Sequence, residues 1–130
     1  MYKSTTHNVT VSVVPKYLAQ ESIPEKNIFV WSYTVRIENN GDDALQLRAR
    51  HWKITDGYGR VQEVHGPGVI GEQPVIKPGD SFEYTSGTPL STPSGIMTGS
   101  YDMETTDGQT MGVVIPAFSL DTPENPKVLH

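Results

Sequence analysis

The strongest constraint on the fold is a regular alternation of apolar and polar side chains over residues 29–37. One face of this segment carries Phe29, Trp31, Tyr33, Val35 and Ile37. A period of two residues is typical of a β-strand with one buried face. The segment Asn-Asn-Gly-Asp-Asp follows at residues 39–43 and favours a turn. The sequence therefore predicts a strand at residues 29–37 that contributes five large side chains to a core.

Composition agrees with a chain built from strands. Val, Ile, Thr, Tyr, Phe and Trp account for 45 of the 130 residues, whereas Ala and Leu together account for 10. Branched and aromatic side chains fit a pleated sheet and lose rotamer freedom in a helix. The 12 glycines and 10 prolines predict frequent turns. These totals exclude a helical bundle, a Rossmann enzyme and a membrane protein.

Further alternating or apolar segments predict the remaining strands. They lie at residues 9–13, 45–54, 60–65, 75–76, 82–86, 99–105 and 109–115. Seven or eight short strands predict one all-β domain over residues 1–130, a fibronectin-III/immunoglobulin-like β-sandwich of two antiparallel sheets. A surface loop rich in Pro, Ser, Thr and Gly is expected at residues 87–95, and an extended C-terminal segment at about 116–130.

Two hairpins can be predicted with their register. If residues 39–43 are a loop, Ile37 pairs with Leu45, and the change of apolar parity after His51 indicates a β-bulge near Arg50. In the second hairpin, a three-residue loop at 106–108 pairs Met103 with Met111, Tyr101 with Val113 and Gly99 with Ile115. Gly108 then occupies the loop position that requires a left-handed backbone.

Gly66, Gly68 and Gly71 form the pattern G-x-G-x-x-G. In a dinucleotide enzyme these glycines close a tight turn, and a following helix N-terminus holds a pyrophosphate. Here the segment Gly71-Glu72-Gln73-Pro74 and the later Pro78-Gly79 break any such helix. Two interpretations remain. The backbone N–H groups cup an anion, or the glycines simply permit a sharp loop.

The chain carries 10 basic and 15 acidic residues, a net charge of -5, which argues against nucleic-acid binding. Its cations nevertheless cluster, because Arg48, Arg50, Lys53 and Arg60 fall within thirteen residues. In the predicted register Arg48 lies opposite Thr34 and Arg50 opposite Ser32, on the non-core face. With the glycine loop they form a candidate site for a phosphate-containing ligand or an acidic peptide. The candidate residues are Gly66, Gly68, Gly71, Arg48, Arg50 and Arg60. The alternative is a solvated strand face that discourages edge pairing.

No metal or catalytic motif stands out. The four histidines show neither H-x-H nor H-E-x-x-H spacing, and the chain has no cysteine. His51 and His65 could still converge in space, which makes them the metal candidates, although an isolated histidine is the commoner outcome. No Ser-His-Asp order or G-x-S-x-G elbow is present, so a non-enzymatic protein is expected. The absence of a signal peptide and of an apolar run of membrane-spanning length predicts a cytoplasmic protein without membrane insertion.

Several segments together resemble the ApaG family, also called CorD. They are Phe29–Ile37, Leu47–Trp52, Gly66–Gly71, Phe82–Gly87 and Ile115–Phe118. The resemblance implies a fibronectin-III-like sandwich and a small bacterial cytoplasmic protein associated genetically with cobalt resistance and magnesium efflux. Similar eukaryotic domains look like protein-binding modules. The family's glycine motif corresponds to Gly66, Gly68 and Gly71.

Three functions follow as alternatives. The first is a non-enzymatic module that binds a protein partner, with a homodimer also conceivable. The second is a pyrophosphate or nucleotide binder that uses residues 66–71 and the nearby arginines. The third is an accessory in divalent-cation homeostasis, which must act indirectly because the chain has no membrane span. No resident cofactor is expected; Co²⁺, Mg²⁺ or a nucleotide are the candidate ligands.

Overall fold

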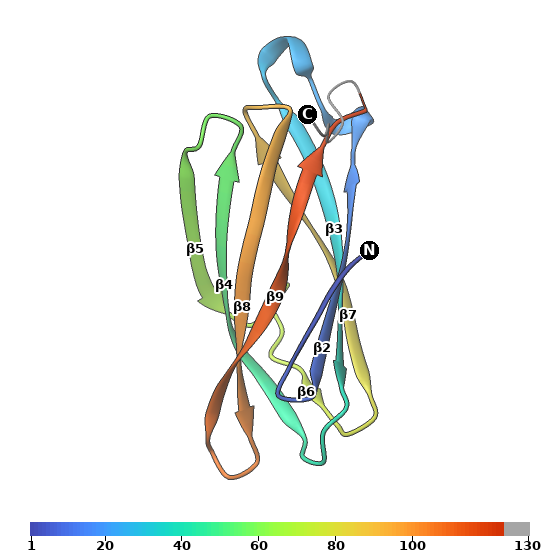
Figure 1. The fold of residues 1–130 in the computed structure, drawn as a ribbon, viewed down its shortest axis with the longest axis vertical. Coiled ribbons are helices and arrows are strands. Elements are labelled where there is room, and N and C mark those ends of the chain that lie inside the picture. The colour runs from blue at the N-terminus through green and yellow to red at the C-terminus, as the bar shows by residue number, and fades with distance from the viewer. Residues whose placement is uncertain (124–130) are drawn as a thin grey trace.

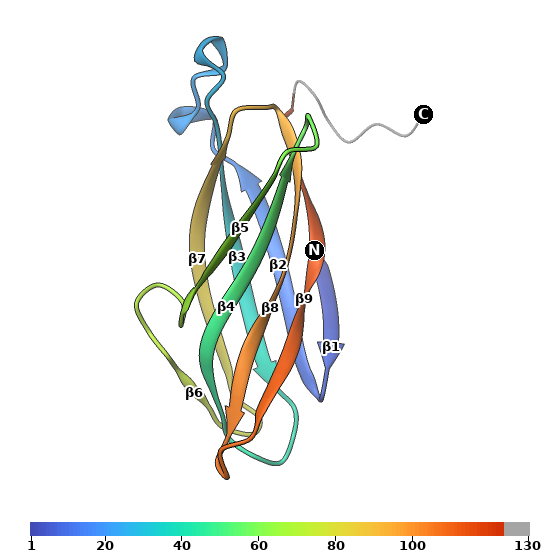
Figure 2. The same cartoon turned by 90° about the vertical axis from the view of Figure 1, so that its left-hand side faces the viewer.

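The structure, a computed structural model, describes residues 1–123 and consists of two antiparallel sheets packed face to face (Figures 1 and 2). The strands are β1 (Tyr2–Thr6), β2 (Val9–Tyr17), β3 (Phe29–Asn39), β4 (Leu45–Asp56), β5 (Val61–Pro67), β6 (Val75–Ile76), β7 (Ser81–Leu90), β8 (Ser94–Thr105) and β9 (Thr110–Asp121). Two 3-10 turns, η1 (Ala19–Glu21) and η2 (Pro24–Lys26), separate β2 from β3. The four-stranded sheet has the order β1-β2-β3-β7. The five-stranded sheet has the order β5-β4-β8-β9, with β6 also paired to β4.

This architecture confirms the predicted fibronectin-III/immunoglobulin-like sandwich, with nine strands among the described residues. The additional strand is β1, whose sequence Tyr-Lys-Ser-Thr-Thr contains one large apolar side chain and therefore gave no periodic signal. Within residues 1–123 no helix is long and apolar enough to cross a bilayer. Of the C-terminal segment expected at 116–130, residues 116–121 belong to β9, and residues 124–130 lie outside the described part of the chain.

The alternating strand of the sequence supplies the centre of the core. All five of its large apolar side chains are buried in β3, and Trp31 is fully buried. The Trp31 indole Nε1 donates a hydrogen bond of 2.9 Å to the carbonyl oxygen of Asp121, and its ring packs edge-on against Tyr17. Because Asp121 ends β9 in the opposite sheet, Trp31 ties the two layers together.

The predicted hairpin across residues 39–43 is wrong. β3 pairs with β2 and β7, whereas β4 pairs with β5, β6 and β8, so the two strands lie in opposite sheets. Buried Asn39 organises the crossing. Its Nδ2 donates to the carbonyl oxygens of Asp43 (2.8 Å) and Ile76 (2.9 Å), and its Oδ1 accepts from the Gly41 N–H (3.0 Å). An apolar face directed at the core fits a hairpin within one sheet and also two strands in opposite sheets. Alternation of apolar residues alone could not distinguish these two arrangements.

The bulge in β4 lies two residues earlier than predicted. The register against β8 shifts between Leu47 and Ala49, which makes Arg48 the extra residue. Beyond the bulge the even-numbered positions face inward, as the burial of Trp52 shows. Arg50 therefore lies on the core side of its strand, and its predicted place on the solvent face is wrong.

The second hairpin is confirmed. Met103 pairs with Met111, Tyr101 with Val113 and Gly99 with Ile115, and Gly108 has a φ of +87°.

The expected loop at 87–95 is much shorter, because β7 continues to Leu90 and β8 begins at Ser94. Pro89 is compatible with β7 because this strand lies at the edge of its sheet, where a missing N–H costs little.

The two sides of the sandwich differ. On one side β1 lies against β9, where Ser4 Oγ donates to the Val114 carbonyl oxygen (3.1 Å) and the Val114 N–H donates to Thr6 Oγ1 (3.2 Å). Tyr2 of β1 also packs against Phe118 of β9. At the other side lie the edge strands β5 and β7 and the short strand β6 (Figure 2). The sandwich is thus closed along one side and hollowed along the other.

Candidate functional site: a groove between two strand edges

A groove runs between β5 and β7. It consists of three adjoining hollows of about 200, 270 and 210 Å³. Ile54, Gln62 and Pro89 line both the first and the second hollow. The second and third hollows share Tyr33, Arg50, Trp52 and Ser86. The shared residues make the three hollows one continuous depression.

Both walls of the groove are strand edges. Among the described residues β5 pairs only with β4, and β7 pairs only with β3. In an edge strand, alternate main-chain N–H and C=O groups point away from the sheet and remain available to another strand. The floor is aromatic, because Tyr33 and Trp52 pack edge-on with ring centroids 5.3 Å apart. The groove therefore offers main-chain hydrogen bonds at its walls and apolar surface at its base.

Arg50 lies at one end of the groove and contacts residues 66–71, here called the glycine segment. Its Nη1 donates to the carbonyl oxygens of Pro67 (2.9 Å) and Gly68 (3.0 Å). A Cβ at Gly66 would lie 3.0 Å from the guanidinium, and a Cβ at Gly68 would lie 2.1 Å from the Glu72 carbonyl oxygen. The first two glycines thus let the chain wrap closely around Arg50 and turn back on itself.

The glycine segment has two free donors. The Gly68 N–H donates to the Arg48 carbonyl oxygen, and Val69 and Glu72 exchange two main-chain hydrogen bonds, all of 2.8 Å. Ile70 and Gly71 have positive φ angles of 44° and 79°, and within residues 1–123 their N–H groups have no acceptor. Both residues line the same hollow as Arg50. This end of the groove is therefore a concave set of donors beside a cation.

The predicted cluster of arginines is not a single site. The expected pairings of Arg48 with Thr34 and of Arg50 with Ser32 are wrong, since Thr34 and Ser32 pair with β2 and β7. The Arg48 side chain is exposed and makes no hydrogen bond or ion pair among the described residues. Of the three candidate arginines, only Arg50 contacts the glycine segment through its side chain.

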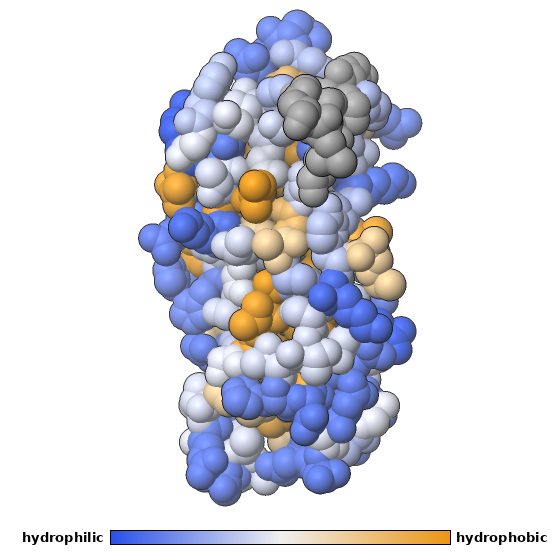
Figure 3. All heavy atoms as spheres, in the orientation of Figure 1, coloured by the Kyte–Doolittle hydropathy of each residue, from blue (hydrophilic) through white to orange (hydrophobic). Residues whose placement is uncertain are grey.

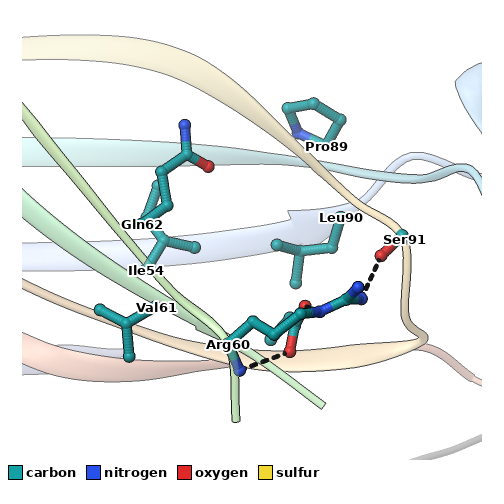
Figure 4. Close-up of a pocket in the computed structure, with 8 residues that line it drawn as sticks. Ile54, Arg60, Val61, Gln62, Pro89, Leu90 and Ser91 are labelled. Carbon is teal, nitrogen blue, oxygen red and sulfur yellow. Dashed lines mark hydrogen bonds and ion pairs between the residues drawn. The ribbon is translucent and has the colours of Figure 1, made fainter. Parts of the chain in front are cut away.

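Arg60 lies at the opposite end of the groove (Figure 4). Its Nε is 2.7 Å from Asp56 Oδ2, and its Nη2 donates to Ser91 Oγ at 2.9 Å. Desolvation acts to raise the pKa of Asp56, but hydrogen bonds from Arg60 and Tyr58 outweigh it and hold the pKa below its usual value. The two charges at this end offset each other, so Arg50 is the one groove cation without a carboxylate partner among the described residues.

Tyr84 lines the groove beside Arg50, and its hydroxyl forms a short buried hydrogen bond with that of Tyr101. Burial raises the pKa of Tyr84 well above its ordinary value of 10.0, outweighing the hydrogen bond with Tyr101 and the nearby Arg50 charge, which lower it. Burial likewise raises the pKa of Tyr101, and Tyr84 adds to that effect. Both phenols are therefore neutral donors and acceptors at physiological pH.

We expect the fold to lose stability above about pH 10 through these two phenols. The unfolded chain releases their protons near pH 10, whereas the folded chain retains them, so their contribution is complete below that pH and is lost as the pH rises further. Urea unfolding at pH 8, 10 and 11 measures the effect. Phenolate absorbance at pH 11 should be lower in the folded protein than in denaturant, because Tyr84 and Tyr101 keep their protons only in the folded chain. Equal phenolate absorbance in the two states at pH 11 would contradict this.

The structure also brings His51 and His65 together, although both lie outside the groove. His7 is exposed in the turn after β1, and His130 lies beyond the described residues. Within residues 1–123 no group of three or more His, Cys, Asp or Glu side chains could hold a metal ion.

Sequence reasoning missed most of the groove. The sequence places Ser86, Gln62 and Val64 in strands, but nothing in their local pattern reveals which strands become edges. The face toward the viewer in Figure 3 shows apolar side chains only as separate patches bordered by hydrophilic ones. That face therefore carries no broad apolar surface.

Comparison with known proteins gives a consistent assignment. The model of the ApaG domain matches residues 19–105. Protein ApaG of Rhodospirillum centenum is 63% identical over 123 residues, covering 95% of both chains, and Protein ApaG of Paramagnetospirillum magneticum is 60% identical over 129 residues, covering 98% of this chain and 99% of that protein. A crystal structure of an ApaA protein from Bordetella pertussis superimposes with a TM-score of 0.87 at 49% identity, covering 90% of this chain and 95% of that one. The chain belongs to the ApaG domain family.

Proposed function

We propose that the protein is a non-enzymatic interaction module of the cytoplasm whose groove binds an extended segment of a partner protein. The observation that carries this proposal is a groove walled by two strand edges that are unpaired among residues 1–123, with Arg50 at one end lacking a carboxylate partner in the same part of the chain. An extended segment can add to a strand edge through main-chain hydrogen bonds while its side chains enter pockets. The link to cobalt resistance and magnesium efflux that the family resemblance implies would then act through the bound partner.

The charges in the groove define the partner segment further. Within residues 1–123 the charged residues of its lining are Arg50, Arg60 and Asp56, and Asp56 is neutralised by Arg60. An acidic side chain in the partner would therefore meet a favourable potential at Arg50, despite the net charge of -5 on the whole chain. The expected ligand is an extended segment with apolar residues and one carboxylate.

A phosphate-containing ligand is the second candidate. The free N–H groups of Ile70 and Gly71 beside Arg50 favour it, because an anion accepts hydrogen bonds from such donors. A pyrophosphate would occupy only this end of the groove and would leave the edge of β7 untouched. The two candidates thus predict different footprints.

Peptides selected from a random ten-residue library test the proposal. We expect the bound peptides to carry an acidic residue and to shift the amide resonances of β7 and β5. Ser86→Trp, which places an indole in the groove, should weaken binding at least tenfold. Thr85→Trp is the matched control, because Thr85 is the exposed neighbour on the other face of the same strand. This variant should bind the peptides as tightly as the natural chain does.

Circular dichroism melts confirm that both variants fold. Equal binding by Ser86→Trp and the natural chain, or the recovery of no peptide, would contradict the proposal. Shifts confined to Ile70 and Gly71 on addition of pyrophosphate or ATP would instead support the phosphate ligand.

A further inference from the structure

A separate cluster lies on the outer face of the five-stranded sheet. His51 of β4 and His65 of β5 are direct cross-strand partners, and Asp102 lies on β8, on the other side of β4. His51 Nδ1 is 2.6 Å from His65 Nδ1, and His51 Nε2 is 2.9 Å from Asp102 Oδ2. The imidazole ring centroids are 4.8 Å apart. None of the three residues lines the groove.

The hydrogen-bond partners assign the tautomer of His51. An ionised carboxylate only accepts hydrogen bonds, so His51 Nε2 carries the proton that Asp102 receives. In neutral His51 the lone pair then lies on Nδ1, which faces His65. His65 is exposed, and its Nε2 has no hydrogen-bond partner among residues 1–123. The two Nδ1 atoms therefore face each other, and the His65 ring is the exposed one of the pair.

We propose that His51 and His65 bind a divalent transition-metal ion through their Nδ1 atoms, with Asp102 holding His51 and water completing the coordination. Imidazole nitrogen suits Zn²⁺, Cu²⁺ and Ni²⁺. A ligating histidine usually donates its other ring N–H to a carboxylate or carbonyl, as His51 does here. When the ion binds, the proton between the two Nδ1 atoms moves to His65 Nε2, so no net proton is released.

The geometry requires only a small adjustment. Two Zn–N bonds of about 2.0–2.1 Å at a tetrahedral angle place the nitrogens about 3.3 Å apart. The two Nδ1 atoms must therefore separate by roughly 0.7 Å from their present 2.6 Å. Rotation of the exposed His65 ring on edge strand β5 supplies this movement, while Asp102 keeps His51 in place.

The same donor set excludes magnesium. Mg²⁺ requires oxygen ligands in a near-octahedral arrangement. The Asp102 carboxylate is engaged by His51 Nε2, and the two atoms that face each other are nitrogens. The site therefore discriminates between transition metals and hard cations of the same charge.

Titration of the ¹⁵N-labelled full-length chain with ZnCl₂ tests the proposal through the imidazole nitrogen resonances. The Nδ1 signals of His51 and His65 should move together with one dissociation constant, and MgCl₂ at tenfold higher concentration should move neither. His65→Gln should weaken Zn²⁺ binding at least tenfold, and Asp102→Asn should weaken it by about 10- to 100-fold. His7→Asn, which changes an exposed histidine elsewhere, should leave the affinity unchanged.

All three substitutions alter surface side chains, and circular dichroism verifies that each variant is folded. Zn²⁺ should also raise the melting temperature of the natural chain but not that of His65→Gln, since a ligand that binds only the folded state stabilises it. Nδ1 resonances that stay unmoved at 1 mM Zn²⁺ would overturn the proposal, as would unchanged affinity in His65→Gln.

Discussion

Replacing Trp31 with alanine is expected to lower the free energy of unfolding by about 3–5 kcal/mol. The indole is fully buried, packs against Tyr17 and donates to the Asp121 carbonyl oxygen of the opposite sheet. Its removal therefore opens a cavity and breaks a link between the layers. Guanidinium unfolding followed by far-ultraviolet circular dichroism measures the loss without relying on tryptophan fluorescence.

Trp31→Phe separates the two contributions. It retains most of the buried ring but leaves the Asp121 carbonyl oxygen without its donor, so a loss of about 1–2 kcal/mol is expected. A loss below about 1 kcal/mol for Trp31→Ala would show that this side chain is not central to the core.

Gly68→Ala is expected to cost about 2–3 kcal/mol and to loosen the segment that wraps Arg50. Gly68 has a φ of +58°, and a Cβ would lie 2.1 Å from the main-chain oxygen of Glu72, which no side-chain movement can relieve. The paired hydrogen bonds between Val69 and Glu72 should open as a result. Amide hydrogen exchange at these two residues and urea unfolding measure the two effects.

Gly71→Ala is the matched control. Gly71 also has a positive φ, of 79°, but a Cβ there would meet no atom within 4 Å. Only the backbone strain remains, and a cost of about 1 kcal/mol is expected. Equal costs at the two glycines would contradict the close turn around Arg50, because the clash is the feature that distinguishes them.

The sequence predicted the elements that depend on local pattern. Alternation identified β3, and the position of Gly108 identified the register of the β8–β9 hairpin, because a three-residue loop with a left-handed third position admits only that pairing. It did not predict the partners of β3. Pairing within a sheet and packing across the core both require the same apolar face. Buried Asn39, whose side chain bonds to Gly41, Asp43 and Ile76 at the crossing, resembles an ordinary turn residue in the sequence.

The groove could not be predicted from the sequence for a related reason. Whether Arg50 faces the core or the solvent depends on the position of a single extra residue in β4, and placing the bulge at Arg50 instead of Arg48 reverses the answer. The sequence did identify Gly66, Gly68 and Gly71, either as an anion-binding loop or as glycines that permit a sharp turn, but it did not show that they let the chain enclose Arg50. The contact between His51 and His65 follows from the β4–β5 register, which only the structure provides.

The most direct test of the proposed function is the backbone contact between β7 and a bound peptide. Nuclear Overhauser effects between a selected acidic peptide and the labelled chain should connect the peptide main chain to alternate residues of β7, with the peptide carboxylate near Arg50. Contacts to β1 or to the outer face of β8 and β9, with none to β7, would contradict the account.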